Sequence, residues 1–410
     1  MKIVRVEDLH ADGGLKPFSF VKITTDEGLI GWSEFSEFLG SQGLSAVIRR
    51  LSEHVIGLDP LQSSRLSTML RARVRVADGG LNAQAVAAIE NACLDIEAKA
   101  LGVPVHRLFG GAVRDRLRVY WSHCGSYRAR GAKTLDRPPV RSLDDLVELG
   151  REVKERGFSA LKTNLLMFEG DKPHAFLRES PGFGYGKGHP ELNLEPEVLD
   201  AMVAQMHAFR QGAGPSIGIA LDVNFNYRPA GLKRLAKALE PLGLAWLEMD
   251  VYDARTLADL RRSTSTPIGS MEAVYGRRHA IPFFVERAVD YAIIDAMWNG
   301  FSEAVKMATL AEGFEVNINS HAFSSPLGLL IGAQLCALSP NFNYVEMDVD
   351  QPPVSAELFH SQLKVENGEL ILPERPGWGL EVNEEALARH APDARAAERW
   401  LRKRSIDDPS

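Results

Sequence analysis

The sequence predicts an α/β protein in which a closed barrel of parallel strands is joined to a smaller α+β domain. Two observations carry this prediction. From Leu117 onward, short apolar runs alternate with helical stretches, which is typical of βα units in a parallel sheet. The chain also has 410 residues, whereas an α/β barrel takes up about 250. A second domain is therefore expected.

The elements are expected in three successive segments. Residues 1–37 alternate like strands, with a turn at Asp26–Gly28, and residues 43–102 show helical patterns, most regularly from Ala85 to Leu101. We assign residues 1–115 to the smaller domain, 116–358 to a barrel of about eight strands, and 359–410 to a segment that returns to the first domain. Within the barrel, helices are predicted at 142–157, 196–210, 230–239 and 254–263.

Three carboxylates follow successive apolar runs in the second half of the chain. Asp222, Glu248 and Glu272 are separated by 26 and 24 residues, which suits one strand–helix repeat. Because a closed barrel brings the C-terminal ends of its parallel strands around one mouth, these acids are expected to be neighbours. Clustered carboxylates need a compensating cation, and an oxygen-only ligand set suits Mg²⁺. The alternative is that each acid caps the next helix or faces solvent.

The same period continues with Asp295 and His321. An aspartate on one strand end can hydrogen-bond a histidine on the next, which orients the imidazole and raises its basicity. We predict His321 as a general base, the alternative being a structural histidine. Lys162, on an earlier strand, could neutralise a substrate carboxylate or merely extend toward solvent. Glu346, on the last strand, would support the site or hydrogen-bond an enolate.

This order of polar residues resembles that of the mandelate racemase group (mandelate racemase/muconate lactonizing enzyme family) of the enolase superfamily. The residues that carry the resemblance are Lys162, Asn164, Asp222, Glu248, Glu272, Asp295, His321 and Glu346, with the segments Thr25–Glu34, Ala88–Pro104, Leu108–Gly111 and Pro373–Leu380. The resemblance implies a (β/α)7β TIM-like barrel and an N-terminal α+β capping domain completed by the C-terminal segment. It also implies one Mg²⁺ per subunit and a closed homo-oligomer, from dimer to octamer.

The chain departs from the family pattern at two places. Family members that use two bases have Lys-x-Lys on the second strand, and here the second position is Asn164. Because an amide cannot take a proton, reversible inversion by that pair is not expected. Where the family usually has Glu-Glu-Pro, this chain has Glu248-Met249-Asp250, which keeps the metal ligand and changes its surroundings.

Five residues are candidates for substrate binding: His123, Asn164, Asn224, Arg178 and His189. Asn224 would share the strand direction of the nearby acid and bind a substrate hydroxyl or a metal-bound water, or it is a turn residue. His123 could touch substrate, although we favour simple packing. Residues 168–189 are rich in glycine and mixed charge. They form either a lid, in which Arg178, Lys187 or His189 would meet the far end of the substrate, or a partly disordered excursion.

Composition excludes several classes of partner. The formal net charge of −7 and the lack of a lysine/arginine tract argue against nucleic acid or an anionic membrane. Met1–Asp8 alternates like a strand and carries acids where a signal peptide would be apolar, and no run of about 18 apolar residues occurs. The odd count of three distant cysteines indicates reduced thiols. We therefore expect a cytoplasmic protein that acts on a small molecule.

The resemblance implies an acid-sugar dehydratase that acts on aldonates or aldarates. His321 would remove the proton α to the carboxylate, and the metal with Lys162 would stabilise the enediolate. His321 would then hand its proton to the leaving β-hydroxyl, which gives a 2-keto-3-deoxy acid. One alternative is an isomerase (epimerase, racemase or cycloisomerase) that uses the same enediolate. Another is a non-catalytic sugar-acid-binding protein, for which an aspartate-positioned base would have no purpose.

Overall fold

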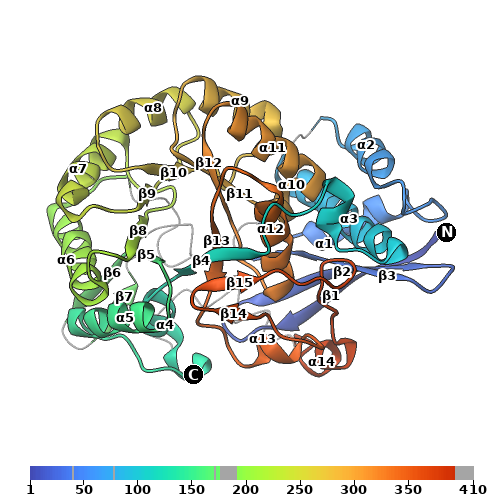
Figure 1. Cartoon of the computed structure of the whole chain (residues 1–410), viewed down its shortest axis with the longest axis horizontal. Helices are drawn as coiled ribbons and strands as arrows, with labels where there is room; N and C mark the ends of the chain where they lie inside the picture. Colours follow the sequence, from blue (N-terminus) through green and yellow to red (C-terminus); the bar gives the residue numbers. More distant parts are fainter. Residues whose placement is uncertain (39–40, 77–78, 170–171, 176–191, 393–410) are drawn as a thin grey trace.

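The computed structural model describes residues 1–38, 41–76, 79–169, 172–175 and 192–392, and these contain a closed barrel of eight parallel strands (Figure 1). In order around the barrel, the strands are β4 (Arg116–Ser122), β5 (Ala160–Asn164), β8 (Gly218–Asp222), β9 (Trp246–Glu248), β10 (Ile268–Ser270), β11 (Tyr291–Ile294), β12 (Asn317–Ser320) and β13 (Phe342–Asp348). Pairing of β13 with β4 closes the ring. The predicted barrel is confirmed.

Helices surround this barrel on the outside (Figure 1). They are α4 (Ser126–Leu135), α5 (Leu143–Glu155), α6 (Pro196–Ala213), α7 (Pro229–Leu239), α8 (Ala254–Arg262), α9 (Gly276–Val285), α10 (Ala296–Asn299), α11 (Phe301–Gly313) and α12 (Pro326–Leu338), with a short 3-10 turn at Glu240–Leu242. Local sequence explains several starts. Ser142 and Asp145 form a capping box at α5, Asp253 caps α8, and α6 and α7 begin with proline.

The N-terminal part forms a three-stranded antiparallel sheet covered by helices. Its elements are β1 (Ile3–Asp12), β2 (Pro17–Thr25), β3 (Ile30–Phe35), α1 (Leu44–Ser52), α2 (Ser63–Arg73) and α3 (Gly80–Leu101), followed by a 3-10 helix at Val105–Phe109. A side-chain contact joins this sheet to the barrel. Glu34 on β3 accepts hydrogen bonds from the backbone N–H groups of Ser325 and Gly328 at the start of α12.

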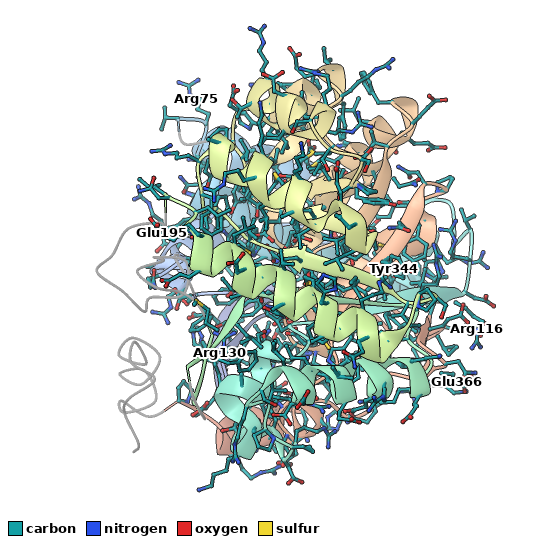
Figure 2. The ribbon with its side chains drawn as sticks, turned by 90° about the vertical axis from the view of Figure 1, so that its left-hand side faces the viewer. Arg75, Arg116, Arg130, Glu195, Tyr344 and Glu366 are labelled. Carbon is teal, nitrogen blue, oxygen red and sulfur yellow. The ribbon has the colours of Figure 1, made fainter. Side chains whose placement is uncertain are left out.

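The C-terminal segment contacts both parts of the molecule. It contains α13 (Val354–Glu357), β14 (Val365–Glu366), β15 (Glu369–Ile371) and α14 (Glu384–Arg389). β15 pairs antiparallel with β4, and Arg116 forms ion pairs with Glu366 and Glu369 at that edge (Figure 2). Glu384 on α14 forms an ion pair with Lys22 of β2 at 2.6 Å. The domain boundaries at 115 and 358 remain predictions.

An aromatic layer fills the barrel below the ends of its strands. Tyr120 and Trp246 pack edge to face at 5.2 Å, and Tyr291 and Tyr344 pack against the same group. Because side chains fill the interior, the space for a ligand lies above this layer, at the C-terminal ends of the strands.

The segment after β5 is only partly described. β6 (Leu166–Glu169) and β7 (Lys172–Ala175) form an antiparallel hairpin. The rest of the predicted lid, including Arg178 and His189, lies outside the described residues. Among the helices that the structure describes, none is long and apolar enough to cross a membrane.

Candidate active site

A cavity of about 1130 Å³ opens at the C-terminal ends of the barrel strands. Seven of the polar residues that the sequence predicts for the site line it: His123, Lys162, Asp222, Asn224, Glu272, His321 and Glu346. The N-terminal part also contributes to the wall, through Ser36, Phe38 and Gln84 among others. Both parts of the molecule therefore shape the site.

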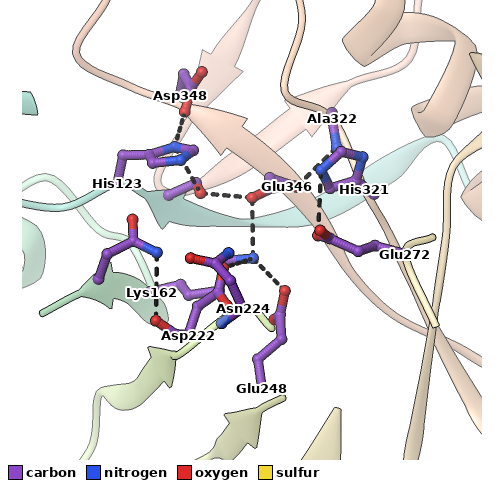
Figure 3. Close-up of polar contacts among 12 residues, drawn as sticks. His123, Lys162, Asp222, Asn224, Glu248, Glu272, His321, Ala322, Glu346 and Asp348 are labelled. Atoms are coloured by element: carbon purple, nitrogen blue, oxygen red, sulfur yellow. Dashed lines mark hydrogen bonds and ion pairs between the residues drawn. The ribbon is translucent and has the colours of Figure 1, made fainter. Parts of the chain in front are cut away.

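The three predicted metal ligands lie on adjacent strand ends. Asp222 and Glu248 are opposite each other in the register of β8 and β9, and Glu272 follows β10 by two residues. Lys162 lies among them, with its Nζ 2.7 Å from Glu248 and 3.5 Å from Asp222 (Figure 3). The other oxygen of Glu248 accepts a hydrogen bond from the indole N–H of Trp246 at 2.9 Å.

Burial and repulsion by neighbouring carboxylates raise the pKa values of Glu248 and Glu272. Burial raises the pKa of Glu248 to about 8; the charges of Asp222 and Glu272 add to this effect, while Lys162 opposes it. Burial also raises the pKa of Glu272. Next to them, burial together with the charges of Glu272 and Asp222 raises the pKa of Asp250 well above its usual value. Negative charge is thus in excess at this end of the barrel.

The donor set fits a hard cation. Carboxylate oxygens are the ligands that Mg²⁺ prefers, and Oδ2 of Asp250 is buried without a hydrogen-bond partner among the described residues. As the side chains stand, however, no three acidic, histidine or cysteine groups in the described ranges are arranged to hold a metal ion. Glu248 is paired with Lys162, and Glu272 lies 3.4 Å from His321. Those contacts would have to change for the acids to share one ion.

Lys162 contacts protein carboxylates on two sides. Besides Glu248, its Nζ lies 3.2 Å from Glu346 on β13. Burial acts to lower the pKa of Lys162, but Glu248 and Glu346 outweigh it and hold the pKa well above its usual value. Glu346 also accepts hydrogen bonds from the hydroxyl of Ser122 at 2.6 Å and the N–H of Ala322 at 2.8 Å. Against burial, Lys162 and His321 keep the pKa of Glu346 below its usual value.

The predicted pair of His321 and Asp295 is formed. Nδ1 of His321 lies 2.6 Å from Oδ2 of Asp295, and the other oxygen of Asp295 accepts the N–H of Trp298 at 2.7 Å. If Nδ1 carries the proton in the neutral ring, Nε2 is left as the basic nitrogen. Burial acts to lower the pKa of His321, but the charge of Glu272 and the hydrogen bond to Asp295 raise it to about 10.

The three substrate-binding candidates in the described residues differ in what they contact. Asn224 lines the cavity, but β8 ends at Asp222, so Asn224 is a turn residue with a φ of 50° and does not share a strand direction with the acid. The amide of Asn164 donates to the backbone carbonyl of Asp222 at 3.4 Å. His123 lines the cavity and also hydrogen-bonds Asp348 at 2.7 Å.

Asp250 lies close to the charges of Glu272 and Asp222 but was not predicted as a site residue from the sequence. Asp250 stands two residues after Glu248, a spacing that places both on one side of an extended segment and could have signalled its role. Trp298 packs on the ring of His321 at 4.8 Å between centroids. Phe225 and Tyr252 stack at 5.2 Å on the cavity wall. Phe225 and Tyr252 were not predicted, and they carry no sequence signal that separates them from core positions.

Family models match most of the chain. Residues 145–386 match the model described as enolase C-terminal domain-like. Residues 13–110 match the model of the mandelate racemase/muconate lactonizing enzyme N-terminal domain.

Individual relatives cover nearly the whole chain. The chain is 30% identical to a D-galactonate dehydratase of Variovorax paradoxus over 96% of both chains. It is 29% identical to a D-xylonate dehydratase of Haloferax volcanii, covering 95% of this chain and 89% of the relative. A solved structure of a candidate L-alanine-DL-glutamate epimerase from Burkholderia xenovorans, bound to magnesium and fumarate, shares 40% identity with a TM-score of 0.92, covering 96% of this chain and 97% of that one.

Proposed function

The chain belongs to the mandelate racemase/muconate lactonizing enzyme family of the enolase superfamily, and on this premise we propose that it is a Mg²⁺-dependent acid-sugar dehydratase. The substrates would be aldonates or aldarates, and the product a 2-keto-3-deoxy acid. The relatives named as D-galactonate and D-xylonate dehydratases support this substrate class. We take His321 as the base, with Asp295 as its positioning residue.

The observation that carries the proposal is the placement of His321 between Asp295, which binds one ring nitrogen, and Glu272, which lies beside the other. Asp295, 2.6 Å from Nδ1, holds the imidazole so that Nε2 lies 3.4 Å from Glu272, one of the three proposed metal ligands. A carboxylate substrate bound beside those acids would present its α proton to Nε2. Removing that proton is difficult because it adds a second negative charge beside the first, so nearby positive charge is needed.

The remaining groups of this chain would bind and orient the substrate. Lys162 provides an ammonium that can neutralise a substrate carboxylate once it exchanges its protein partners. The cavity wall also offers the polar side chains of Asn224 and Gln84 for substrate hydroxyls. A bound Mg²⁺ would stabilise the negative charge that develops on the substrate and compensate Glu272, whose charge raises the pKa of His321. The leaving β-hydroxyl also needs a proton.

An isomerase is the second candidate. The relative of known structure at 40% identity is named as a candidate epimerase and binds fumarate, a dicarboxylate. Against this alternative, Asn164 stands where two-base members of the family have a second lysine. The dehydratase is favoured because an elimination needs a base on one face of the α carbon only, whereas an epimerase or racemase also needs a group on the opposite face to return a proton there.

A substrate screen tests the proposal. Purified protein with Mg²⁺ is incubated with a library of aldonates and aldarates, and keto acids are detected with semicarbazide. We expect keto acid from one or a few substrates and none after addition of EDTA. The matched variant His321→Asn should lose keto acid formation and also α-proton exchange in D2O. Full activity in that variant would disprove the assigned base, and an epimerised product without loss of water would favour the isomerase.

The other properties that we propose for the protein follow from the same family. They are a closed homo-oligomer, one Mg²⁺ per subunit and a cytoplasmic location.

A further inference from the structure

A second pair of histidine and aspartate lies in the same cavity. His123 directly follows β4, and Asp348 is the last residue of β13. Nδ1 of His123 lies 2.7 Å from Oδ1 of Asp348. This repeats the arrangement of His321 and Asp295, in which Nδ1 also faces the aspartate at 2.6 Å. In each pair, the nitrogen that remains for the cavity is Nε2.

The two imidazoles flank Glu346. β4, β13 and β12 are neighbours in the barrel, so His123, Glu346 and His321 come from three adjacent strand ends (Figure 3). All three residues line the cavity. A substrate bound over Glu346 and Lys162 could therefore contact both imidazoles at two of its carbon positions.

Charged and polar groups hold the second pair in place. Asp348 also accepts from Nζ of Lys16 at 2.8 Å and from the hydroxyl of Tyr127 at 3.1 Å. Burial acts to raise the pKa of Asp348, but Lys16 and His123 outweigh it and lower the pKa to about 2. Asp348 therefore stays ionised and can stabilise a protonated ring. Tyr127 stacks on the imidazole of His123 at 4.5 Å, nearly parallel, which fixes the plane of the ring.

We propose that His123, positioned by Asp348, is the general acid that protonates the leaving β-hydroxyl. This inference rests on the proposed dehydratase function. A general base must be unprotonated when the reaction begins, whereas a general acid must be protonated. Two separately positioned imidazoles can meet both requirements at once, whereas a single His321 would have to collect its proton at one carbon and deliver it at the next.

His321 takes the proton of the α carbon, and the electron pair of that C–H bond moves into the carboxylate to give the enediolate. When the pair returns, it forms the double bond between the α and β carbons, and the β C–O bond breaks toward oxygen. The Nε2 proton of His123 goes to that oxygen, and water leaves. The enol that remains takes a proton from solvent at the β carbon and loses its O–H proton, which gives the keto acid. His321 then loses a proton to solvent and His123 takes one up.

His123→Asn is the variant that tests the assignment. The backbone of His123 has a φ of 49°, and asparagine tolerates this left-handed conformation better than most residues. Its amide can still donate to Asp348. We expect keto acid formation to fall by about 10²-fold to 10⁴-fold, the usual contribution of a general acid. In D2O, the variant should still exchange the α proton of recovered substrate, because His321 is intact.

A change of leaving group separates an acid from a structural residue. With the analogue that carries chloride in place of the β-hydroxyl, no proton is needed for departure, so His123→Asn should turn it over at a rate comparable to the wild type. His10→Asn serves as the control, because His10 also has an aspartate partner, Asp8 at 3.1 Å, but is not among the residues that line the cavity. This variant should behave as wild type with both substrates.

Three results would overturn the assignment. The first is wild-type dehydration by His123→Asn. The second is a folded His123→Asn variant whose activity falls to the same degree with the hydroxyl and the chloride substrate, or whose α-proton exchange falls to the same degree as its dehydration. Either of these leaves the dehydratase function standing. A wild-type enzyme that returns an epimer instead of a keto acid would overturn the proposed function and the role of His123 together.

Discussion

At the scale of single residues, the site is dominated by buried carboxylates that need positive charge. Asp222, Glu248, Glu272 and Asp250 lie close enough to repel one another, and Lys162 forms ion pairs with Asp222 and Glu248. Burying acids side by side is costly unless each finds a compensating partner. The strand ends therefore hold a site whose charge balance depends on what binds there.

Replacing Glu248 with glutamine should weaken Mg²⁺ binding. The variant keeps the shape of the side chain but removes one of three charges, and loss even of supporting groups around metals costs about 10-fold to 100-fold in affinity. We expect at least the lower figure, measured by isothermal titration calorimetry, with activity lost in parallel. Glu346→Gln is the matched control, since Glu346 is buried in the same site but is not a proposed ligand. An equal loss in both variants would contradict the assigned ligand set.

At the scale of elements, two helices outside the barrel approach unusually closely. α5 and α6 pack through Gly150 and Gly212, and a Cβ on Gly212 would lie 1.9 Å from the backbone oxygen of Val147. Backbone cannot move aside as a flexible side chain would. The glycines thus let α5 and α6 pack closely against each other, and β8, which follows α6, ends at Asp222.

Gly212→Ala should therefore destabilise the protein. We expect the free energy of unfolding to fall by about 1–3 kcal/mol, as for other overpacked sites, measured by chemical denaturation. Gly313→Ala at the end of α11 is the control, because a Cβ there meets nothing within 4 Å. That change should be neutral or stabilise by about 0.4–1 kcal/mol. Unchanged stability in Gly212→Ala would show that the two helices can separate without cost.

At the scale of the whole molecule, side chains from the N-terminal part reach into the barrel. Lys16 contacts Asp348, and Glu34 binds the first turn of α12. From the C-terminal segment, the indole N–H of Trp378 donates to the carbonyl of Trp32 on β3 at 3.0 Å. Burial raises the pKa of Glu34 to about 7, although hydrogen bonds from Ser325 oppose the change. The junction between the two parts thus contains a carboxyl group that titrates near neutral pH.

This junction predicts a pH dependence of stability. Because the folded-state pKa of Glu34 is raised above its ordinary value of 4.5, its contribution is fully present below about pH 4.5 and is lost as the pH rises through about 7. The stability of wild type relative to Glu34→Gln should therefore decline between pH 5 and pH 8. The decline would be at most about 3 kcal/mol, at about 1.4 kcal/mol per pKa unit. Denaturation at both pH values measures it, and a constant difference would contradict the raised pKa.

The sequence by itself determined the barrel and the strand ends that carry the site. A closed parallel sheet forces a regular strand–helix repeat, so the spacing of Asp222, Glu248 and Glu272 predicted their neighbourhood, and the next repeat predicted the contact between Asp295 and His321. The sequence did not decide whether Asn224 continues the strand or begins a turn, because a residue just past a strand end can do either.

Only the tertiary structure decided which side chains from strands distant in the sequence meet. His123 and Asp348 are 225 residues apart, and they touch because closure of the ring sets β13 beside β4. Lys162 pairs with Glu248 because their side chains point inward from different strands to a common space. Periodicity in the sequence gives each residue its strand and its end. Packing of the whole molecule fixes how the ring closes. It therefore decides which inward-pointing side chains lie within hydrogen-bond distance of each other.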